Sequence, residues 1–109
     1  DAAAAGTSKV AVRGVQPGQF ALHQNTPNPF NPETVIRFEL PEARPVRVEV
    51  YDSVGRVVRV LVDQYLAAGS HAVGWDGTDQ RGTALASGAY LVRLSVGEFG
   101  AVRKALLVR

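Results

Sequence analysis

Apolar and polar residues alternate along most of the chain, and the alternation is clearest in residues 34–40 and 46–50. A period of two predicts β-strands with one buried face. The buried faces comprise Ile36, Phe38, Leu40, Val46, Val48 and Val50. Charged residues fill the intervening positions on the solvent side, namely Arg37, Glu39, Arg47 and Glu49. Because opposite charges favour strand pairing by roughly a few tenths of a kcal/mol, we expect these runs to be neighbouring strands across a turn at residues 41–45.

The stretch from residue 71 to residue 94 contains the only tryptophan of the chain. Its first half places on one face His71, Val73 and Trp75. The apolar face that follows comprises Tyr90, Val92, Leu94 and Val96. A turn rich in glycine and aspartate separates the two halves, which predicts a pair of antiparallel strands. We expect Trp75 and Tyr90 at the centre of a core between two sheets.

The segments before residue 34 and after residue 55 are less regular. Residues 20–22 alternate and predict an edge strand. In residues 24–32, three prolines fix φ and remove backbone donors, so this segment is neither a helix nor a central strand. We expect a rigid, extended crossing in which Phe30 closes one end of the core. Residues 56–62 are apolar at successive positions, so that strand is either buried on both sides or bulged.

The last third of the chain predicts a loop, a hairpin and a final strand. Residues 63–69 are interpreted as a longer loop with Leu66 tucked inward. Residues 96–100 contain a hairpin turn, and residues 101–109 form the last strand. The face that alternates around Lys104 comprises Val102, Leu106 and Val108. The exposed edge of this strand would offer backbone groups to a strand from a partner.

About seven short strands at even spacing are typical of an immunoglobulin-like β-sandwich. We therefore assign the chain to the all-β class with antiparallel strands. The expected core comprises Ile36, Phe38, Val48, Val50, Val73, Trp75, Tyr90, Val92, Leu94 and Leu106.

Composition argues against some classes of function but does not identify the function. The 109 residues fit a single domain that buries a core without disulfides or a structural metal, and the chain has no cysteine. A net charge of +2 from scattered basic residues does not favour nucleic acid or a membrane surface. Residues 1–19 are rich in small residues and lack a signal-peptide pattern, so we expect a linker from an upstream cargo domain. The folded domain is then residues 20–109.

No set of residues predicts catalysis, a metal or another cofactor. His23 and His71 each lack a second ligand at metal-binding spacing. Asp76 and Asp79 lie beside glycines, as in a calcium loop, but the closing glutamate is missing. We expect both aspartates to make Asx turns, in which the carboxylate accepts bonds from amides two residues later.

An ordered series of motifs gives the chain a family resemblance. The blocks are Pro27-Asn28-Pro29-Phe30-Asn31-Pro32, Thr34-Val35-Ile36-Arg37-Phe38, Val50-Tyr51-Asp52-Ser53-Val54-Gly55-Arg56, Ala68-Gly69-Ser70-His71, Trp75-Asp76-Gly77-Thr78-Asp79 and Ser87-Gly88-Ala89-Tyr90, followed by Lys104 and an apolar tail ending at Arg109. Over residues 20–109 the series resembles the C-terminal sorting domain (type A) of the type IX secretion system. The same pattern is shared with the immunoglobulin-like domain of the flagellar hook-capping protein.

The resemblance implies a non-catalytic C-terminal module of a secreted multidomain protein, which directs export across the bacterial outer membrane and attachment to the cell surface. Implied partners are the outer-membrane secretion machinery, a surface sortase-like peptidase, cell-surface lipopolysaccharide reached through the cargo, and an upstream catalytic domain in cis. The module itself would be a monomer that binds no nucleic acid. The sorting-motif residues implied by the resemblance are Pro27, Asn28, Pro29, Gly88, Tyr90, Lys104 and Arg109.

Several alternatives stay open at this stage. Gly88 would also serve as a residue of unusual φ at a strand start, Tyr90 as a core residue, and Lys104 as a solvated side chain. A carbohydrate-binding module of a polysaccharide-degrading enzyme would need exposed rings, for which Tyr65 and Phe99 are the candidates. A structural immunoglobulin-like assembly domain is the remaining alternative.

Overall fold

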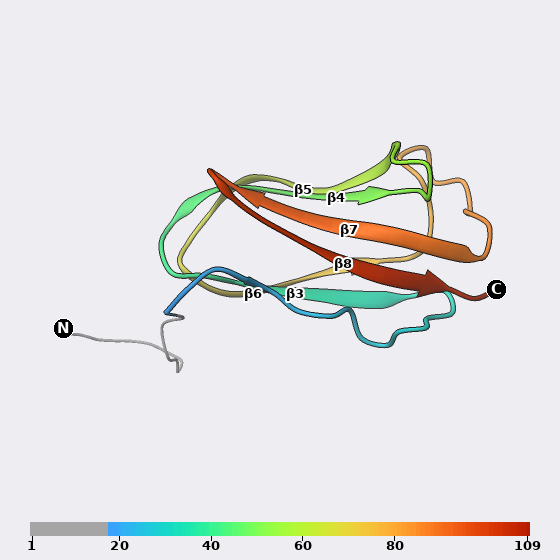
Figure 1. Cartoon of the computed structure of the whole chain (residues 1–109), viewed down its shortest axis with the longest axis horizontal. Helices are drawn as coiled ribbons and strands as arrows, with labels where there is room; N and C mark the ends of the chain where they lie inside the picture. Colours follow the sequence, from blue (N-terminus) through green and yellow to red (C-terminus); the bar gives the residue numbers. More distant parts are fainter. Residues whose placement is uncertain (1–17) are drawn as a thin grey trace.

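The computed structural model describes residues 18–109, which form seven strands in two antiparallel sheets packed face to face (Figure 1). The first sheet has the order β2–β3–β6, with bounds Ala21–Leu22, Thr34–Leu40 and Gly69–Trp75. The second has the order β5–β4–β7–β8, with bounds Val57–Leu66, Arg44–Tyr51, Gly88–Val96 and Phe99–Leu107. The prediction of an all-β sandwich is confirmed, and no membrane-spanning helix occurs in the described range.

The core lies between the inward faces of the two sheets. Alternation in β3, β4 and β7 buries one face of each strand, as the sequence predicts. Trp75 of β6 meets Tyr90 of β7 edge-on, with ring centroids 5.6 Å apart, which confirms the expected centre of the core. Phe30 is 2% exposed and lies 5.3 Å from the Trp75 ring, so it closes one end of the sandwich. Burying side chains of this size stabilises the fold by roughly 1.5–3 kcal/mol each.

Two expected strand pairings are wrong. The strand of residues 34–40 pairs with β2 and β6, whereas the strand of residues 46–50 belongs to β4 in the other sheet. Likewise β6 and β7 do not pair with each other, because Trp75 and Tyr90 face one another across the core. Alternation fixes which face of a strand is buried, but both sheets of a sandwich bury a face in the same way. The pattern therefore cannot assign a strand to a sheet.

Glu49 is also placed differently from the expectation of a solvent-facing charge. Glu49 is only 8% exposed, because its strand β4 lies inside the sheet between β5 and β7. The carboxylate accepts bonds from Arg47 Nε at 2.7 Å and from the Tyr51 hydroxyl at 2.9 Å. These bonds satisfy the charge, and the Arg47 guanidinium is the main reason that the pKa of Glu49 is lowered.

The strand after residue 55 resolves the ambiguity left by the sequence. Register shifts occur between Val48 and Glu49 and between Val50 and Tyr51, which confirms the bulged alternative. The expected loop at residues 63–69 is wrong, because β5 continues to Leu66 and pairs with β4 throughout. Within this added length, Asp63 of β5 forms an ion pair of 3.0 Å with Arg47 of β4. Leu66 still packs against the core.

The last strand has the opposite register to the expected one. Ala105 and Leu107 are buried, whereas Val102 and Val108 are about half exposed and Leu106 lies outside the core. The apolar residues on the outer face outweigh the small Ala105 in the sequence pattern, which caused the wrong assignment of Leu106 to the core. Val73 is half-buried and packs at the edge of the core. The other expected core residues are buried, namely Ile36, Phe38, Val48, Val50, Trp75, Tyr90, Val92 and Leu94.

The edge strand expected at residues 20–22 is confirmed as β2, which pairs only with β3. The hairpin turn expected at residues 96–100 is confirmed between β7 and β8. Of the linker expected at residues 1–19, residues 1–17 lie outside the part of the chain that the structure describes. The domain boundary at residue 20 therefore stays a prediction.

Candidate recognition site

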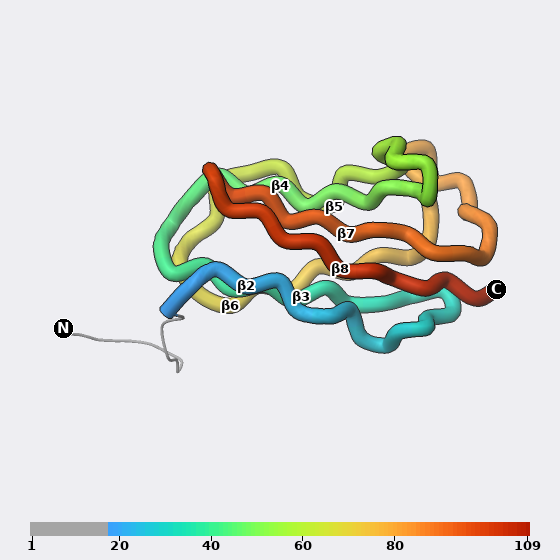
Figure 2. Tube along the Cα trace, viewed as in Figure 1, coloured from blue at the N-terminus to red at the C-terminus, as the bar shows by residue number. Residues whose placement is uncertain are grey.

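The proline segment, residues 24–32, lies along the outer edge of β8 (Figure 2). Phe30 N–H donates to the Leu106 carbonyl, and Val108 N–H donates to the Phe30 carbonyl, both at 2.9 Å. Prolines have no N–H, so only the intervening residues of the segment can donate to a neighbouring strand. The spacing of the prolines thus limits the contact to a short parallel bridge at Phe30.

Asn28 continues this contact through its side chain. Its Oδ1 accepts a bond from Leu106 N–H at 2.8 Å, and its Nδ2 donates to the Lys104 carbonyl at 3.3 Å. The side-chain amide therefore takes the place of a peptide group on the edge of the sheet. Gln24 Nε2 also donates to the Lys104 carbonyl, at 2.6 Å. The edge of β8 is thus occupied from Lys104 to Val108, which corrects the expectation that this edge is open to a partner strand.

Buried polar groups anchor the start of the proline segment. Asn25 is 3% exposed, and its Nδ2 donates to Thr34 Oγ1 at 2.9 Å and to the Pro27 carbonyl at 3.0 Å. The Thr34 hydroxyl donates to the same carbonyl at 2.8 Å. Each of these groups is satisfied, so the segment is fixed to β3 at one point and to β8 at another. Sequence reasoning missed Asn25, because an isolated polar residue has no periodic pattern.

The final residue joins the Trp-Asp-Gly turn to the end of β8. Arg109 Nη2 donates to the Gly77 carbonyl at 2.8 Å and Nε donates to the Leu85 carbonyl at 2.5 Å. Its backbone N–H donates to Ser87 Oγ at 2.8 Å. Gly77 has a φ of 75°, and an added Cβ would lie 3.0 Å from Arg109 Nη2. Gly77 is therefore a packing site as well as a turn residue, which sequence reasoning missed.

Gly88 and Tyr90 begin β7 beside these contacts. The Tyr90 hydroxyl donates to the Ala86 carbonyl at 2.6 Å, and burial raises the pKa of the phenol. The ring packs in the core, so structure accounts for Tyr90. Gly88 has a positive φ of 158°, a backbone conformation that residues with a Cβ rarely adopt, although open space surrounds the position of a Cβ. Backbone conformation, rather than packing, therefore accounts for a glycine there.

Lys104 points away from the core on the outer face of β8. Its backbone pairs with Leu91 of β7, and the residue is exposed. Within residues 18–109 its ammonium makes no ion pair or hydrogen bond, in contrast to its carbonyl. The structure therefore collects the motif residues along β7, β8 and the proline segment. They comprise Pro27, Asn28, Pro29, Gly88, Tyr90, Lys104 and Arg109.

The aspartate turn makes the expected Asx bonds. Asp76 Oδ1 accepts bonds from the Thr78 amide and hydroxyl, and the hydroxyl bond is the main cause of the lowered pKa of Asp76. Asp79 Oδ1 accepts bonds from the amides of Arg81 and Thr83, at 2.9 and 3.0 Å. Residues 18–109 contain no group of three or more acidic, histidine or cysteine side chains placed to hold a metal. The Asx bonds therefore hold the turn together with the bonds that Arg59 and Arg109 donate to it.

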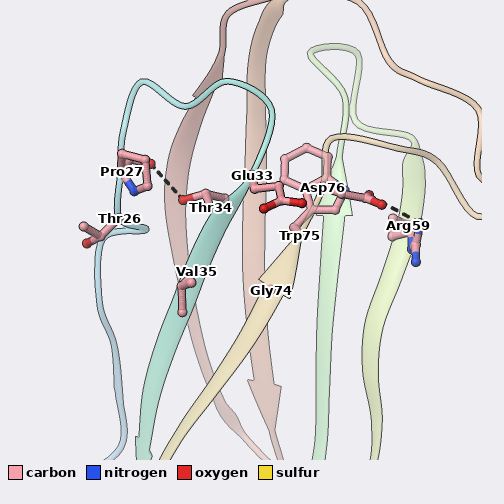
Figure 3. Close-up of a pocket in the computed structure, with 9 residues that line it drawn as sticks. All are labelled: Thr26, Pro27, Glu33, Thr34, Val35, Arg59, Gly74, Trp75 and Asp76. Carbon is pink, nitrogen blue, oxygen red and sulfur yellow. Dashed lines mark hydrogen bonds and ion pairs between the residues drawn. The ribbon is translucent and has the colours of Figure 1, made fainter.

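A cavity of about 500 Å³ lies between this turn and the proline segment (Figure 3). Glu33 and Asp76 contribute carboxylates, and Arg59 contributes a guanidinium. Arg59 Nη1 is already bonded to Thr78 Oγ1 at 2.6 Å and to the Asp79 carbonyl at 2.9 Å. The cavity is therefore lined by two carboxylates and by the Arg59 guanidinium, whose hydrogen bonds help to hold the turn in place.

The two histidines contact other side chains of the domain, and one of the two candidate sugar-binding rings is not exposed. His23 Nε2 lies 2.8 Å from the Glu39 carboxylate, a pairing across two strands that sequence spacing did not reveal. The His71 ring stacks on Phe38, with centroids 5.4 Å apart. Phe99 is not an exposed ring, because it stacks on another phenylalanine of the chain at 5.1 Å and packs against the core. Among the described aromatic residues only Tyr65 is largely exposed, at 68%.

The two packed antiparallel sheets define an immunoglobulin-like β-sandwich module. Residues 24–98 match the FlgD Ig-like domain family, so the chain belongs to this family. The predicted immunoglobulin-like fold is therefore confirmed, together with the relation to FlgD. The finer assignment to the sorting domains of type IX secretion stays a prediction.

Solved structures that are similar to this chain include PorU, PorZ and FlgD. Dimeric latent PorU from Porphyromonas gingivalis is 26% identical with a TM-score of 0.65, and the match covers 87% of this chain and 10% of that chain. PorZ, described as an essential surface component of the type IX secretion system of the same organism, is 19% identical with a TM-score of 0.55 over 83% of this chain and 11% of that chain, which shows the fold alone. FlgD from P. aeruginosa is 29% identical with a TM-score of 0.55, over 68% of this chain and 58% of that chain.

The chain spans about a tenth of the length of PorU and PorZ and less than two thirds of that of FlgD. A search of curated proteins gave no match.

Proposed function

We propose that this domain is a non-catalytic module that directs export of a larger secreted protein across the bacterial outer membrane and its attachment to the cell surface. The observation that carries the proposal is the meeting of the sorting-like motifs at one place. Asn28 of the first block binds the backbone of Lys104 and Leu106 near the last block. Residues separated by more than 70 positions thus form one surface, which a receptor could contact as a unit.

The proposed partners follow from this role. The outer-membrane secretion machinery would contact the surface formed by β7, β8 and the proline segment. A sortase-like peptidase would act on the chain before the sandwich and join the cargo to surface lipopolysaccharide. An upstream catalytic domain would be the cargo in cis, and the module would act as a monomer that binds no nucleic acid. The protein would be secreted and held at the cell surface.

Because β8 contributes to the core, deleting this strand is not a suitable test of the proposal. Ala105 and Leu107 of β8 are part of the core, so deleting residues 101–109 would expose the interior of the sandwich. Loss of export would then reflect unfolding as much as loss of a signal. Substitutions that keep the core intact separate the two effects.

The test follows the full-length protein in its native host, with and without residues 20–109. We expect the deletion to trap folded cargo in the periplasm, and Lys104→Ala to lower surface delivery without changing the melting temperature of the purified domain. Lys104→Arg, which keeps the charge, is the matched control. Unchanged localisation of the cargo after deletion of residues 20–109 would contradict the proposal.

A second candidate function is supported by the family match itself. The chain belongs to the FlgD Ig-like domain family, so a purely structural role in assembly is consistent with the same sandwich. In that case deletion of residues 20–109 would leave export intact and disrupt assembly of the parent protein. Carbohydrate binding is a weaker candidate because Tyr65 is the one largely exposed aromatic ring of the described range. Retention on xylan or cellulose in affinity electrophoresis, lost in Tyr65→Ala, would favour it.

A further inference from the structure

The outer face of the four-stranded sheet carries exposed apolar side chains next to two basic residues, Arg93 and Lys104, that form no ion pair within residues 18–109. This face points away from β3 and β6 (Figure 1). Cross-strand pairing places Val57 beside Tyr51, Tyr51 beside Leu91, and Leu91 beside Lys104. Val57 and Val102 are each 47% exposed and Leu91 is 40% exposed. We call this surface the outer-face patch, and it comprises Tyr51, Val57, Leu91, Arg93, Val102, Lys104 and Leu106.

Two cations of the outer-face patch, Arg93 and Lys104, have no ion-pair partner within residues 18–109. Arg47 is bonded to both Glu49 and Asp63, at 2.7 and 3.0 Å. Glu49 is nearly buried and bonded to Arg47 and Tyr51, and it forms no ion pair with its cross-strand neighbour Arg93. The patch therefore combines exposed apolar side chains with two positive charges that lack an ion-pair partner.

We propose that the outer-face patch docks a protein surface whose apolar side chains are bordered by a carboxylate that pairs with Lys104. Apolar side chains on the partner would cover Leu91 and Val102, and exclusion of water would strengthen the ion pair. This inference rests on the proposed function, in that the partner belongs to the export apparatus. It adds the surface of contact and the chemistry of the partner.

Charge argues against two other occupants. In a symmetric dimer the same patch would face itself, and its carboxylate, Glu49, is already bonded to Arg47 and Tyr51, so neither copy would supply a free counter-charge for Lys104. An anionic bilayer attracts clusters of about four to eight basic residues, whereas this patch has only two cations without an ion pair, Arg93 and Lys104, and Glu49 lies on the same face. A protein partner with a matching carboxylate fits the patch better than either.

Export of the full-length protein in its native host tests the surface. Leu91→Asp and Lys104→Glu change the patch, and Val54→Asp is the matched control because Val54 is 73% exposed in the turn between β4 and β5. We expect the two patch variants to lower surface delivery at least tenfold, and the control to be exported normally. All three purified domains should keep the melting temperature of the wild type, since each changed side chain is exposed. Val102→Asp provides a second patch variant should Leu91→Asp prove unstable.

The outcomes separate this inference from the proposed function. If deletion of residues 20–109 blocks export but the patch variants are exported normally, the docking surface is wrong and the export role stands. If the deletion has no effect, the export role itself fails. A concentration-dependent dimer, or binding to phosphatidylglycerol vesicles, that is lost in Leu91→Asp would overturn the assignment to a protein partner.

A direct binding measurement uses two synthetic peptides of the same length, one alternating valine with glutamate and one alternating valine with lysine. We expect the acidic peptide alone to shift the backbone amide resonances of Leu91 and Val102 in the purified domain. Lys104→Glu should weaken its binding at least tenfold. Equal shifts with both peptides, or shifts confined to other strands, would contradict the proposed chemistry.

Discussion

At the scale of single residues, Gly77 shows how one position can be constrained twice. Its φ of 75° disfavours any residue with a Cβ, and a Cβ there would also meet Arg109 Nη2 at 3.0 Å and the Pro32 carbonyl at 3.3 Å. Gly82 shares the first constraint, with a φ of 85°, but has open space around it. These two glycines of the same turn therefore separate backbone conformation from crowding.

We expect Gly77→Ala to lower the free energy of unfolding by about 2–3 kcal/mol, of which the left-handed backbone accounts for roughly 1–2 kcal/mol. Gly82→Ala should cost only the backbone part, about 1 kcal/mol. Urea unfolding of both variants measures the difference. Equal losses would show that Arg109 and its neighbours move aside at little cost, and that Gly77 is required only for its turn.

At the scale of elements, the proline segment and β8 depend on each other through Asn28. In Asn28→Ala the Leu106 amide loses its acceptor and the Lys104 carbonyl loses one donor, so we expect a loss of about 1–2 kcal/mol in unfolding free energy. Asn28→Asp keeps the acceptor for Leu106 but places a carboxylate near the Lys104 carbonyl. Hydrogen exchange of the Leu106 amide should therefore become faster in Asn28→Ala and stay slow in Asn28→Asp.

The Val108 amide is the internal control, because its bond to the Phe30 carbonyl does not involve Asn28. Slow exchange of Leu106 in Asn28→Ala would show that the backbone bridge at Phe30 holds this edge without help from the side chain. Fast exchange of both amides would show that the whole segment detaches as one unit.

The strands themselves were predictable, but their arrangement was not. Period-two alternation correctly located the strands with buried Ile36, Val48 and Val92, because each has one strongly apolar face. It failed for β8, where apolar Leu106 points outward and small Ala105 points inward. Which strands share a sheet depends on contacts between distant segments, and local alternation is the same in either sheet.

The candidate site was predictable only as a set of separate motifs. The prolines indicated an extended crossing and the position of Phe30, both from local backbone chemistry. The bonds from Asn28 to β8 join residues 76 and 78 positions apart, and no local pattern announces them. The same is true of Arg109 and the Gly77 carbonyl, which are 32 positions apart. The family resemblance identified the motif residues, whereas their contacts with one another are evident only from the folded structure.

At the scale of the whole molecule, hydrogen bonds to carboxylates make the stability of the sandwich depend on pH. Four carboxyl groups have pKa values below the ordinary 4.5 of glutamate or 3.8 of aspartate in the folded state. The bond that most lowers the pKa comes from Ser70 to Glu39, from Arg47 to Glu49, from the backbone amide of Arg56 to Asp52, and from Thr78 to Asp76. These groups lie in both sheets and in two turns, so the effect belongs to the domain as a whole.

A lowered folded-state pKa means that the unfolded chain binds more protons at mildly acidic pH. The resulting stability is complete above the ordinary values of 4.5 and 3.8 and is lost as the pH falls through the lower folded values. We therefore expect the contribution of these four carboxylates to the free energy of unfolding to be complete above about pH 5 and to decrease below about pH 4. Urea unfolding across this range measures it. Glu49→Gln should flatten part of the acid decline, since an amide does not titrate. A profile that stays level below pH 4 would contradict the role of these bonds.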